Sequence, residues 1–303
     1  MAGGKHSQQR GLLLAALGAA ALGAEGIAAK LAYAGGANIL TTLALRFWLA
    51  AIIFGLIMVA LRLQWHMDRP TLGRVVILAL GGQATTVLLL FYAFQRIPAA
   101  VAILFFYIYP VVVVILAAIF LHETLTRARI GALGLTLAGL LVILGFPMDS
   151  LDPRGVAAAL LAALSNGVFL IGQASLLKRL EPLTLNAWTM LVIAPVFLLL
   201  ALATGSFKLA FDSRAGLAIL FLALVCTVFA YLAVALSLKY IGASRVAIIS
   251  TLEPAVTAAL GFLLLGERLH PYQLLGGVLI LAGVTWQQLS GGDRPGRSKE
   301  PTN

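Results

Sequence analysis

The sequence predicts an all-α integral membrane protein in which ten transmembrane helices form two inverted five-helix repeats around a central cavity. Three observations predict it. First, 61% of the 303 residues are hydrophobic and 11% are charged, whereas soluble domains carry about 25% charged residues. Second, apolar segments of bilayer-spanning length recur along the chain. Third, motifs of the first half return in the second half at constant spacing.

The spans follow from the apolar segments. A helix that crosses the hydrocarbon core needs about 20 mainly apolar residues, because its backbone must satisfy its own hydrogen bonds there. Ten such segments lie near residues 11–33, 39–61, 74–94, 99–121, 130–146, 155–177, 183–203, 215–238, 245–265 and 271–290. Apolar segments continue after the first one, which favours a membrane span there over a cleaved signal peptide. Residues 1–10 are expected to form a polar cytoplasmic tail, and residues 291–303 a disordered one.

The basic residues predict the orientation, because Lys and Arg are more frequent in cytoplasmic loops. With the N-terminus in the cytoplasm, fourteen of the 21 basic residues fall on the cytoplasmic side and five on the outer side. Lys30 and Arg46 lie within spans. We therefore expect both termini to be cytoplasmic.

A repeated motif divides the chain into residues 11–148 and residues 149–290. Pro110 and Glu123 return 144 positions later as Pro254 and Glu267, and Gly139 returns as Gly283. Nearer the start of each half the spacing is 148, as for the pairs Lys30–Lys178, Asn38–Asn186 and Thr41–Thr189. Five spans per copy is an odd number, so the second copy is inserted in the opposite direction. Inverted repeats of this kind are common in secondary transporters.

The motifs Tyr109-Pro110, His122-Glu123, Glu253-Pro254 and Gly266-Glu267, with Gly139 and Gly283, are similar to those of a known family. Over roughly residues 11–290 the chain resembles EamA-type ten-helix transporters of the drug/metabolite transporter superfamily. The first copy departs from the family pattern, because Tyr precedes its proline and His precedes its glutamate. The aromatic character of the fourth segment resembles YddG-like aromatic and neutral amino-acid exporters.

The resemblance implies a small-molecule transporter in a bacterial inner membrane that exports neutral and aromatic amino acids by alternating access. It leaves open a multidrug or metabolite exporter, or a proton-coupled antiporter, on the same fold. A membrane scaffold or receptor is the alternative outside transport. We expect the lipid bilayer and a small-molecule substrate as partners.

Ionisable groups within spans are costly and need a reason. Glu25 and Arg46 lie at similar depths in the first and second segments, so we expect them to form an intramembrane ion pair. The pair either clamps the two helices together or contacts a zwitterionic substrate.

Other polar and aromatic residues fall near mid-depth and are candidates for the cavity wall. Alternatively, such side chains form hydrogen bonds between helices. The candidates are Gln83, Phe105, Tyr109, Asn166, Gln173, Thr227, Tyr231 and Glu253. Pro110 and Pro254 each remove a helical hydrogen bond, which makes them candidate hinges.

Several classes of function are disfavoured. His122-Glu123 lacks the second histidine of a zinc-protease motif, and the sequence has neither a G-x-S-x-G motif nor a phosphate-binding P-loop. The four histidines lie at or beyond helix ends, and Cys226 is the single cysteine. The net charge of +10 is scattered over short loops. We therefore expect no enzyme activity, cofactor, metal site or nucleic-acid binding.

Overall fold

The computed structural model describes residues 2–97, 99–144, 151–265 and 271–289, and in these ranges all regular structure is helical. The helices are α1 (Ala2–Gly23), α2 (Glu25–Ala34), α3 (Ile39–Ala60), α4 (Arg69–Ile77), η1 (Leu78–Ala84), α5 (Thr85–Phe94), α6 (Ala99–Phe106), α7 (Tyr109–Phe120), α8 (Arg127–Leu144), α9 (Pro153–Leu176), α10 (Pro182–Ala203), α11 (Ser213–Ala223), η2 (Leu224–Phe229), α12 (Ala230–Ile241), α13 (Ala243–Ser250), α14 (Leu252–Leu265) and α15 (Pro271–Leu289).

Within the described residues, seven helical stretches are long and apolar enough to cross a membrane. They are His6–Ala34, Ile39–Ala60, Arg69–Leu90, Pro153–Leu176, Pro182–Ala203, Ser213–Ile241 and Ala243–Leu264. Each coincides with an expected segment, so a multi-pass helical membrane protein is confirmed.

The remaining three expected spans stay predictions. Segment 99–121 is divided between α6 and α7, segment 130–146 falls on α8, and segment 271–290 falls on α15. The N-terminal stretch differs from its prediction as a polar tail. α1 already begins at Ala2, inside the stretch assigned to a polar tail. The predicted tail 291–303 and the motif Gly266-Glu267 lie outside the described residues.

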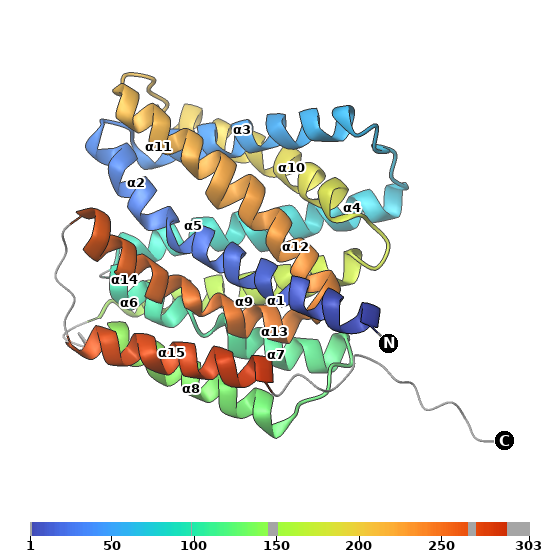
Figure 1. Cartoon of the computed structure of the whole chain (residues 1–303). Coiled ribbons are helices and arrows are strands. Elements are labelled where there is room, and N and C mark those ends of the chain that lie inside the picture. Colours follow the sequence, from blue (N-terminus) through green and yellow to red (C-terminus); the bar gives the residue numbers. More distant parts are fainter. Residues whose placement is uncertain (1, 98, 145–150, 266–270, 290–303) are drawn as a thin grey trace.

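The helices pack side by side in a bundle whose first and second halves are interleaved. α8 lies along α15 at one edge, and α3 lies beside α10 and α11 at the other (Figure 1). Between these edges α1 packs on α12, and α5 packs on α9. Each of these neighbouring pairs joins a helix that precedes residue 149 to one that follows it.

Several rods of the bundle are interrupted near their middle. α1 gives way to α2 at Ala24, α6 to α7 at Tyr107–Ile108, and α13 to α14 at Thr251. η1 and η2 are π-helical, a wide geometry that often marks functional positions.

The prolines explain two of the interruptions. Pro110 lies in the first turn of α7 and Pro254 in the first turn of α14. Proline is tolerated in a first turn, because amides there have no intrahelical partner. The chain therefore starts a new helix at each proline instead of bending one continuous helix.

Short polar side chains cap the helices at the ends of the bundle. Thr41 N donates to Asn38 Oδ1 at 2.9 Å, and Ala215 N donates to Asp212 Oδ1 at 2.8 Å. Hydrogen bonding to Thr71 lowers the pKa of Asp68, which caps α4. The backbone N–H of Arg154 likewise lowers the pKa of Asp152, which caps α9. Each cap satisfies an amide that the helix itself leaves unpaired.

Glycines permit the close contact between α8 and α15. A Cβ atom at Gly139 would lie 2.6 Å from the Gly276 carbonyl oxygen and 2.8 Å from the Ile280 nitrogen. A Cβ atom at Gly283 would lie 2.9 Å from the Ala132 carbonyl oxygen. Because these neighbours are backbone atoms, a side chain is accommodated only if the helices separate. Small residues at helix contacts allow this approach in membranes.

We predict that Gly139→Ala lowers the free energy of unfolding by about 1–3 kcal/mol, the usual cost of overpacking. Unfolding by SDS titration of the purified protein measures this. Gly134→Ala is the matched control on the same helix, because no atom lies within 4 Å of the position of its Cβ. Equal stability of the two variants would contradict the close-contact explanation.

Candidate functional site

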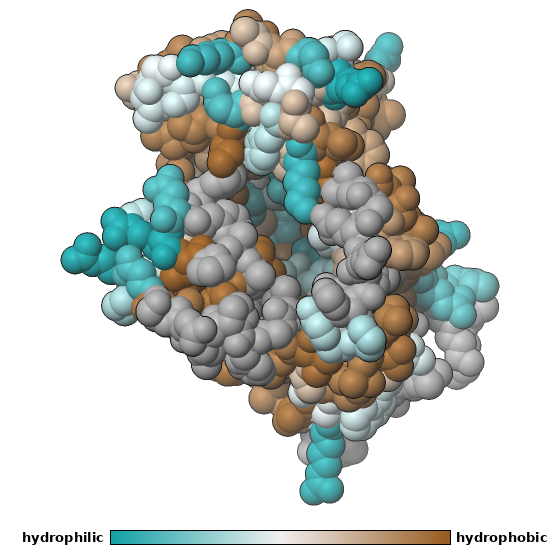
Figure 2. Space-filling view, turned by 90° about the vertical axis from the view of Figure 1, so that its left-hand side faces the viewer, coloured by the Kyte–Doolittle hydropathy of each residue, from teal (hydrophilic) through white to brown (hydrophobic). Residues whose placement is uncertain are grey.

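One end of the bundle is hollowed. Figure 2 views the end of the bundle that lies at the left of Figure 1, and its centre is a hollow with hydrophilic residues in its depth. A cavity of about 680 Å³ at this end lies among the end of α2, the start of α3 and the ends of α5 and α10. Tyr33, Tyr92, Phe197 and Lys208 are among its lining residues.

Arg46 is the centre of the first polar cluster at mid-depth. Its Nη1 and Nη2 contact the two carboxylate oxygens of Glu25 at 2.5 and 3.0 Å. Its Nε donates to Thr227 Oγ1 at 2.7 Å, and Nη2 donates to the Cys226 carbonyl oxygen at 3.4 Å. Arg46 is 4% exposed, whereas the Glu25 side chain is 39% exposed. The expected ion pair is therefore present in the structure, and it also ties α2 and α3 to η2.

Gln83 and Tyr231 form the second cluster. Gln83 lies in η1, and its Nε2 donates to the hydroxyl of Tyr231 in α12. Asn186 Nδ2 in α10 donates to the Tyr231 carbonyl oxygen at 3.3 Å, and Gln173 Nε2 donates to Asn186 Oδ1 at 3.5 Å. The structure thus connects three of the predicted wall residues: Gln83 bonds directly to Tyr231, and Gln173 is linked to Tyr231 through Asn186.

Glu253 is held by a residue that the sequence analysis did not select. The hydroxyl of Tyr107, at the break between α6 and α7, donates to Glu253 Oε2 at 2.9 Å. Tyr107 is 5% exposed, while Glu253 keeps partial exposure. On α1, Gly23 lies against Glu253, and the Gly23 carbonyl oxygen accepts a hydrogen bond from Thr257 at 2.7 Å. The Tyr107–Glu253 hydrogen bond therefore joins the break between α6 and α7 to the start of α14. α1 packs against both α13 and α14.

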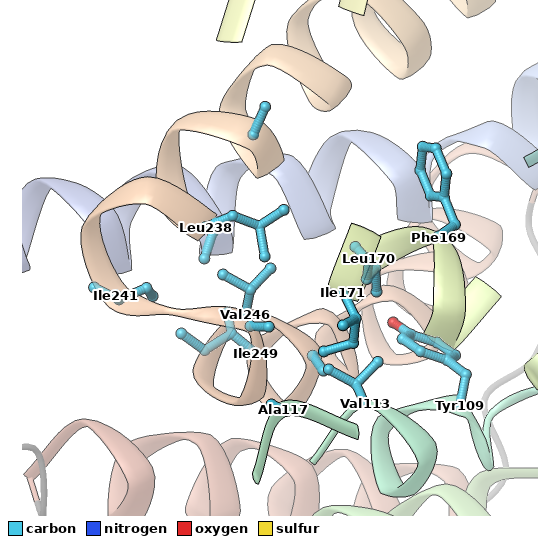
Figure 3. Close-up of a cluster of buried hydrophobic side chains, with 14 of the residues drawn as sticks. Tyr109, Val113, Ala117, Phe169, Leu170, Ile171, Leu238, Ile241, Val246 and Ile249 are labelled. Atoms are coloured by element: carbon cyan, nitrogen blue, oxygen red, sulfur yellow. The ribbon is translucent and has the colours of Figure 1, made fainter. Parts of the chain in front are cut away.

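Three predicted wall residues are placed differently. Tyr109 is 3% exposed and packs in a hydrophobic cluster with Val113, Ile171 and Ile249 (Figure 3). Phe105 packs against a separate cluster around Ile97 and Val101. Phe105 stays outside the polar clusters, whereas the Tyr109 ring lies 5.7 Å from the ring of Tyr107, the residue that bonds to Glu253. Asn166 is partly exposed in α9, and its neighbour Ser165 donates to the carbonyl oxygens of Gly81 and Gly82 at 2.9 Å.

The residues that sequence reasoning missed have identifiable signals. Tyr107 belongs to the same aromatic run as Phe105 and Tyr109, and it lies at the break between α6 and α7. Asn186 was recognised as a repeat match and not as a wall residue. Ser165 carried no signal in the sequence, because a lone serine in an apolar helix usually bonds to its own backbone.

The opposite end of the bundle is closed around α13. All eight residues of α13 are buried. Glu123, in the loop after α7, accepts hydrogen bonds from the backbone N–H groups of Ala243 at 2.8 Å and Ser244 at 3.4 Å. Arg129 Nη1 lies 3.4 Å from Glu123 Oε2 and donates to the Thr124 carbonyl oxygen at 2.6 Å. A carboxylate at a helix N-terminus is favourable for both its hydrogen bonds and the helix dipole.

Gly242 makes this cap possible. Its φ of +82° lies in the region that favours glycine, and a Cβ there would lie 2.7 Å from Glu123 Oε1. Glu123 therefore has a defined structural role, because it fastens the loop after α7 to the start of α13. Among the described residues, no group of three His, Cys, Asp or Glu side chains is placed to hold a metal ion.

Comparison with known proteins places this arrangement in a family. The model of the EamA-like transporter family matches residues 9–145 and 153–286. The chain belongs to this family. An EamA-like transporter fits the seven apolar spans and the hollow described above.

Curated relatives are similar over most of their length. The chain is 28% identical to an uncharacterized transporter of Archaeoglobus fulgidus, over 79% of this chain and 85% of the relative. It is 26% identical to the uncharacterized transporter YdfC of Bacillus subtilis, over 79% and 78%. It is 27% identical to protein PecM of Dickeya dadantii, over 65% and 67%. A crystal structure at 19% identity shares the fold, with a TM-score of 0.79 over 92% of this EamA-like transporter and 96% of the matched chain.

We predict that Glu25 and Arg46 are energetically coupled. Glu25→Gln and Arg46→Met each leave a charge without its partner, so the double variant is expected to lose less stability than the two single losses combined. The expected coupling is about 1–3 kcal/mol. A double-mutant cycle of unfolding in SDS measures it.

The exposed pair Arg96–Asp152, at 3.2 Å with side chains 36% and 30% exposed, is the control. We expect its coupling to stay below about 1 kcal/mol. Additive losses at Glu25 and Arg46 would mean that the bridge does not stabilise the fold.

Proposed function

We propose that this EamA-like transporter exports neutral and aromatic amino acids by alternating access around the central hollow. The observation that carries the proposal is the contrast between the two ends of the bundle. One end is hollowed, with hydrophilic residues in its depth, and the other is closed by a wholly buried helix under the Glu123 cap. A transporter needs a second state in which this contrast is reversed.

The reversal is easiest to explain if residues 11–148 and 149–290 are two inverted copies with ten spans in total. Several observations support this reading. The same family model matches two stretches of the chain, and each mid-depth cluster joins one half to the other.

The seam between α8 and α15 supports the same reading. Gly139 and Gly283 are equivalent at the spacing of 144, and each lies where its helix approaches the backbone of the other. A two-fold axis that relates α8 to α15 requires such a reciprocal contact.

The proposed orientation combines the charge bias with the hollow. The loop 204–212 and the end of α2 surround the hollowed end, and the charge bias assigns both to the outer side. In this orientation both termini are cytoplasmic, the membrane is the bacterial inner membrane, and the structure is outward-open.

The nature of the site supports an amino acid rather than a polyanion. The charge of Arg46 is neutralised by Glu25, and the second cluster is built from uncharged amides and a phenol. Nearer the outer end, the cavity of about 680 Å³ beside Tyr33, Tyr92 and Phe197 is within the usual range of small-ligand sites, about 300–1,000 Å³. The choice of neutral and aromatic amino acids also rests on the resemblance of the aromatic motif.

A flux assay in proteoliposomes tests the proposal. We expect saturable transport of phenylalanine, tryptophan, threonine and methionine, because a pocket with few fixed charges discriminates weakly among neutral side chains. Empty liposomes are the control.

Other outcomes separate the alternatives. Transport of a lipophilic cation without these amino acids would indicate a multidrug exporter. Accumulation that needs a pH gradient and is lost in Glu253→Gln would indicate a proton-coupled antiporter. A protein without transport of any solute would be a scaffold or receptor.

We also predict that the Glu123 cap holds the closed end shut. A cysteine at Ala117 in a Cys226→Ser background reports on opening, because Ala117 is fully buried in α7. Adding Glu123→Ala is expected to raise its rate of maleimide labelling about tenfold, since a charge-assisted hydrogen bond contributes about 1.5–3 kcal/mol.

Glu181→Ala is the control for this experiment. Glu181 is also predicted to be cytoplasmic, but its side chain is 68% exposed and lies 3.3 Å from Lys239, an ion pair open to solvent. Equal labelling in both variants would show that the cap does not close this end.

A further inference from the structure

Glu253 has an unusual environment for a carboxylate at mid-depth. It receives one hydrogen bond, from Tyr107 at 2.9 Å. In the described part of the chain, its second oxygen accepts no hydrogen bond from protein. Glu253 as a residue is partly exposed, whereas Tyr107 is 5% exposed. A single phenol leaves most of the acceptor capacity of a carboxylate unused.

Aromatic rings gather around the same place. The ring centroid of Tyr107 lies 5.8 Å from that of Phe106 and 5.7 Å from that of Tyr109. The Phe106 and Tyr109 centroids are 5.3 Å apart. Ring faces attract cations, and aromatic groups beside a negative charge are a common way to recognise an ammonium group.

The nearest buried cation does not supply a complementary site for a carboxylate. Arg46 uses both terminal nitrogens on Glu25 and its Nε on Thr227. It is 4% exposed, so a substrate carboxylate would first have to break a paired, buried contact. Glu25 and Arg46 together add no net charge beside Glu253.

We propose that Glu253, Tyr107 and Phe106 form a subsite for an organic ammonium group. This inference rests on the proposed function and deepens it: the transporter recognises the ammonium of its substrate and does not require the carboxylate. Decarboxylated aromatic amines are therefore ligands of the same site. Carboxylates without an amine are not.

Three compounds with the same ring test the inference. Phenylalanine carries both charged groups, 2-phenylethylamine lacks the carboxylate, and 3-phenylpropionate lacks the ammonium. Binding to the purified full chain is measured by calorimetry, and flux is measured in proteoliposomes. We expect 2-phenylethylamine to bind within about threefold of phenylalanine, and 3-phenylpropionate at least about tenfold more weakly.

Variants assign the effect to the subsite. Glu253→Gln is expected to weaken 2-phenylethylamine at least about tenfold, because the amide keeps the shape and removes the charge. Phe106→Leu leaves the carboxylate in place and is expected to weaken the amine about two- to fivefold. It also tests the subsite if Glu253→Gln does not fold. Glu181→Gln removes an exposed carboxylate elsewhere and is expected to leave binding unchanged.

The outcomes separate this inference from the proposed function. Binding of the amine without transport of any compound would keep the subsite and reject the exporter. Transport of phenylalanine that excess 2-phenylethylamine does not inhibit would reject the subsite and keep the exporter. Equal binding of 3-phenylpropionate and phenylalanine would also overturn the ammonium subsite.

Discussion

A guanidinium inside a bilayer must be neutralised and hydrogen-bonded, and the centre of this bundle is organised around Arg46. Its partners lie on α2 and η2, so satisfying one charge brings together helices that are about 180 residues apart in sequence. The low dielectric makes the arrangement costly to disturb, because loss of any partner leaves a buried donor without an acceptor. Two other hydrogen bonds at mid-depth, Gln83–Tyr231 and Tyr107–Glu253, join further helices of the same bundle.

The interrupted helices are the second feature that organises the centre of the bundle. Backbone groups freed by a break need partners, and in lipid these must come from the protein. Thr257 Oγ1 serves both the Gly23 and Glu253 carbonyl oxygens, at 2.7 and 2.9 Å, where α1 packs against α14. The Thr227 hydroxyl in η2 similarly donates a hydrogen bond to the Leu222 carbonyl oxygen. Irregular backbone is therefore stabilised where the polar side chains gather, and this is where a ligand needs accessible polar groups.

The sequence predicted most of the helical organisation because bilayer thickness and backbone hydrogen bonding leave few choices for apolar segments of this length. It also predicted the Glu25–Arg46 bridge, since two buried opposite charges at one depth have a strong reason to meet. It did not predict Tyr107 as the partner of Glu253. A helical wheel assumes one continuous helix from Phe105 to Tyr109, whereas the break before Pro110 rotates the residues on either side of it. Tyr109, an expected wall residue, packs in the same hydrophobic cluster as Tyr107, with the two ring centroids 5.7 Å apart. The position of a helix break depends on the helices packed against it, and a short stretch of sequence does not contain that information.

The hydrogen bond between Tyr107 and Glu253 has an energetic consequence under the proposed two-fold exchange. At the spacing of 144 the positions equivalent to Tyr107 and Glu253 are Thr251 and Tyr109, and neither carries a charge. That bridge is lost without an equal replacement when the halves exchange. The bias between the two states is therefore set by the positions where the copies have diverged, and a ligand that replaces Tyr107 at Glu253 acts directly on that bias.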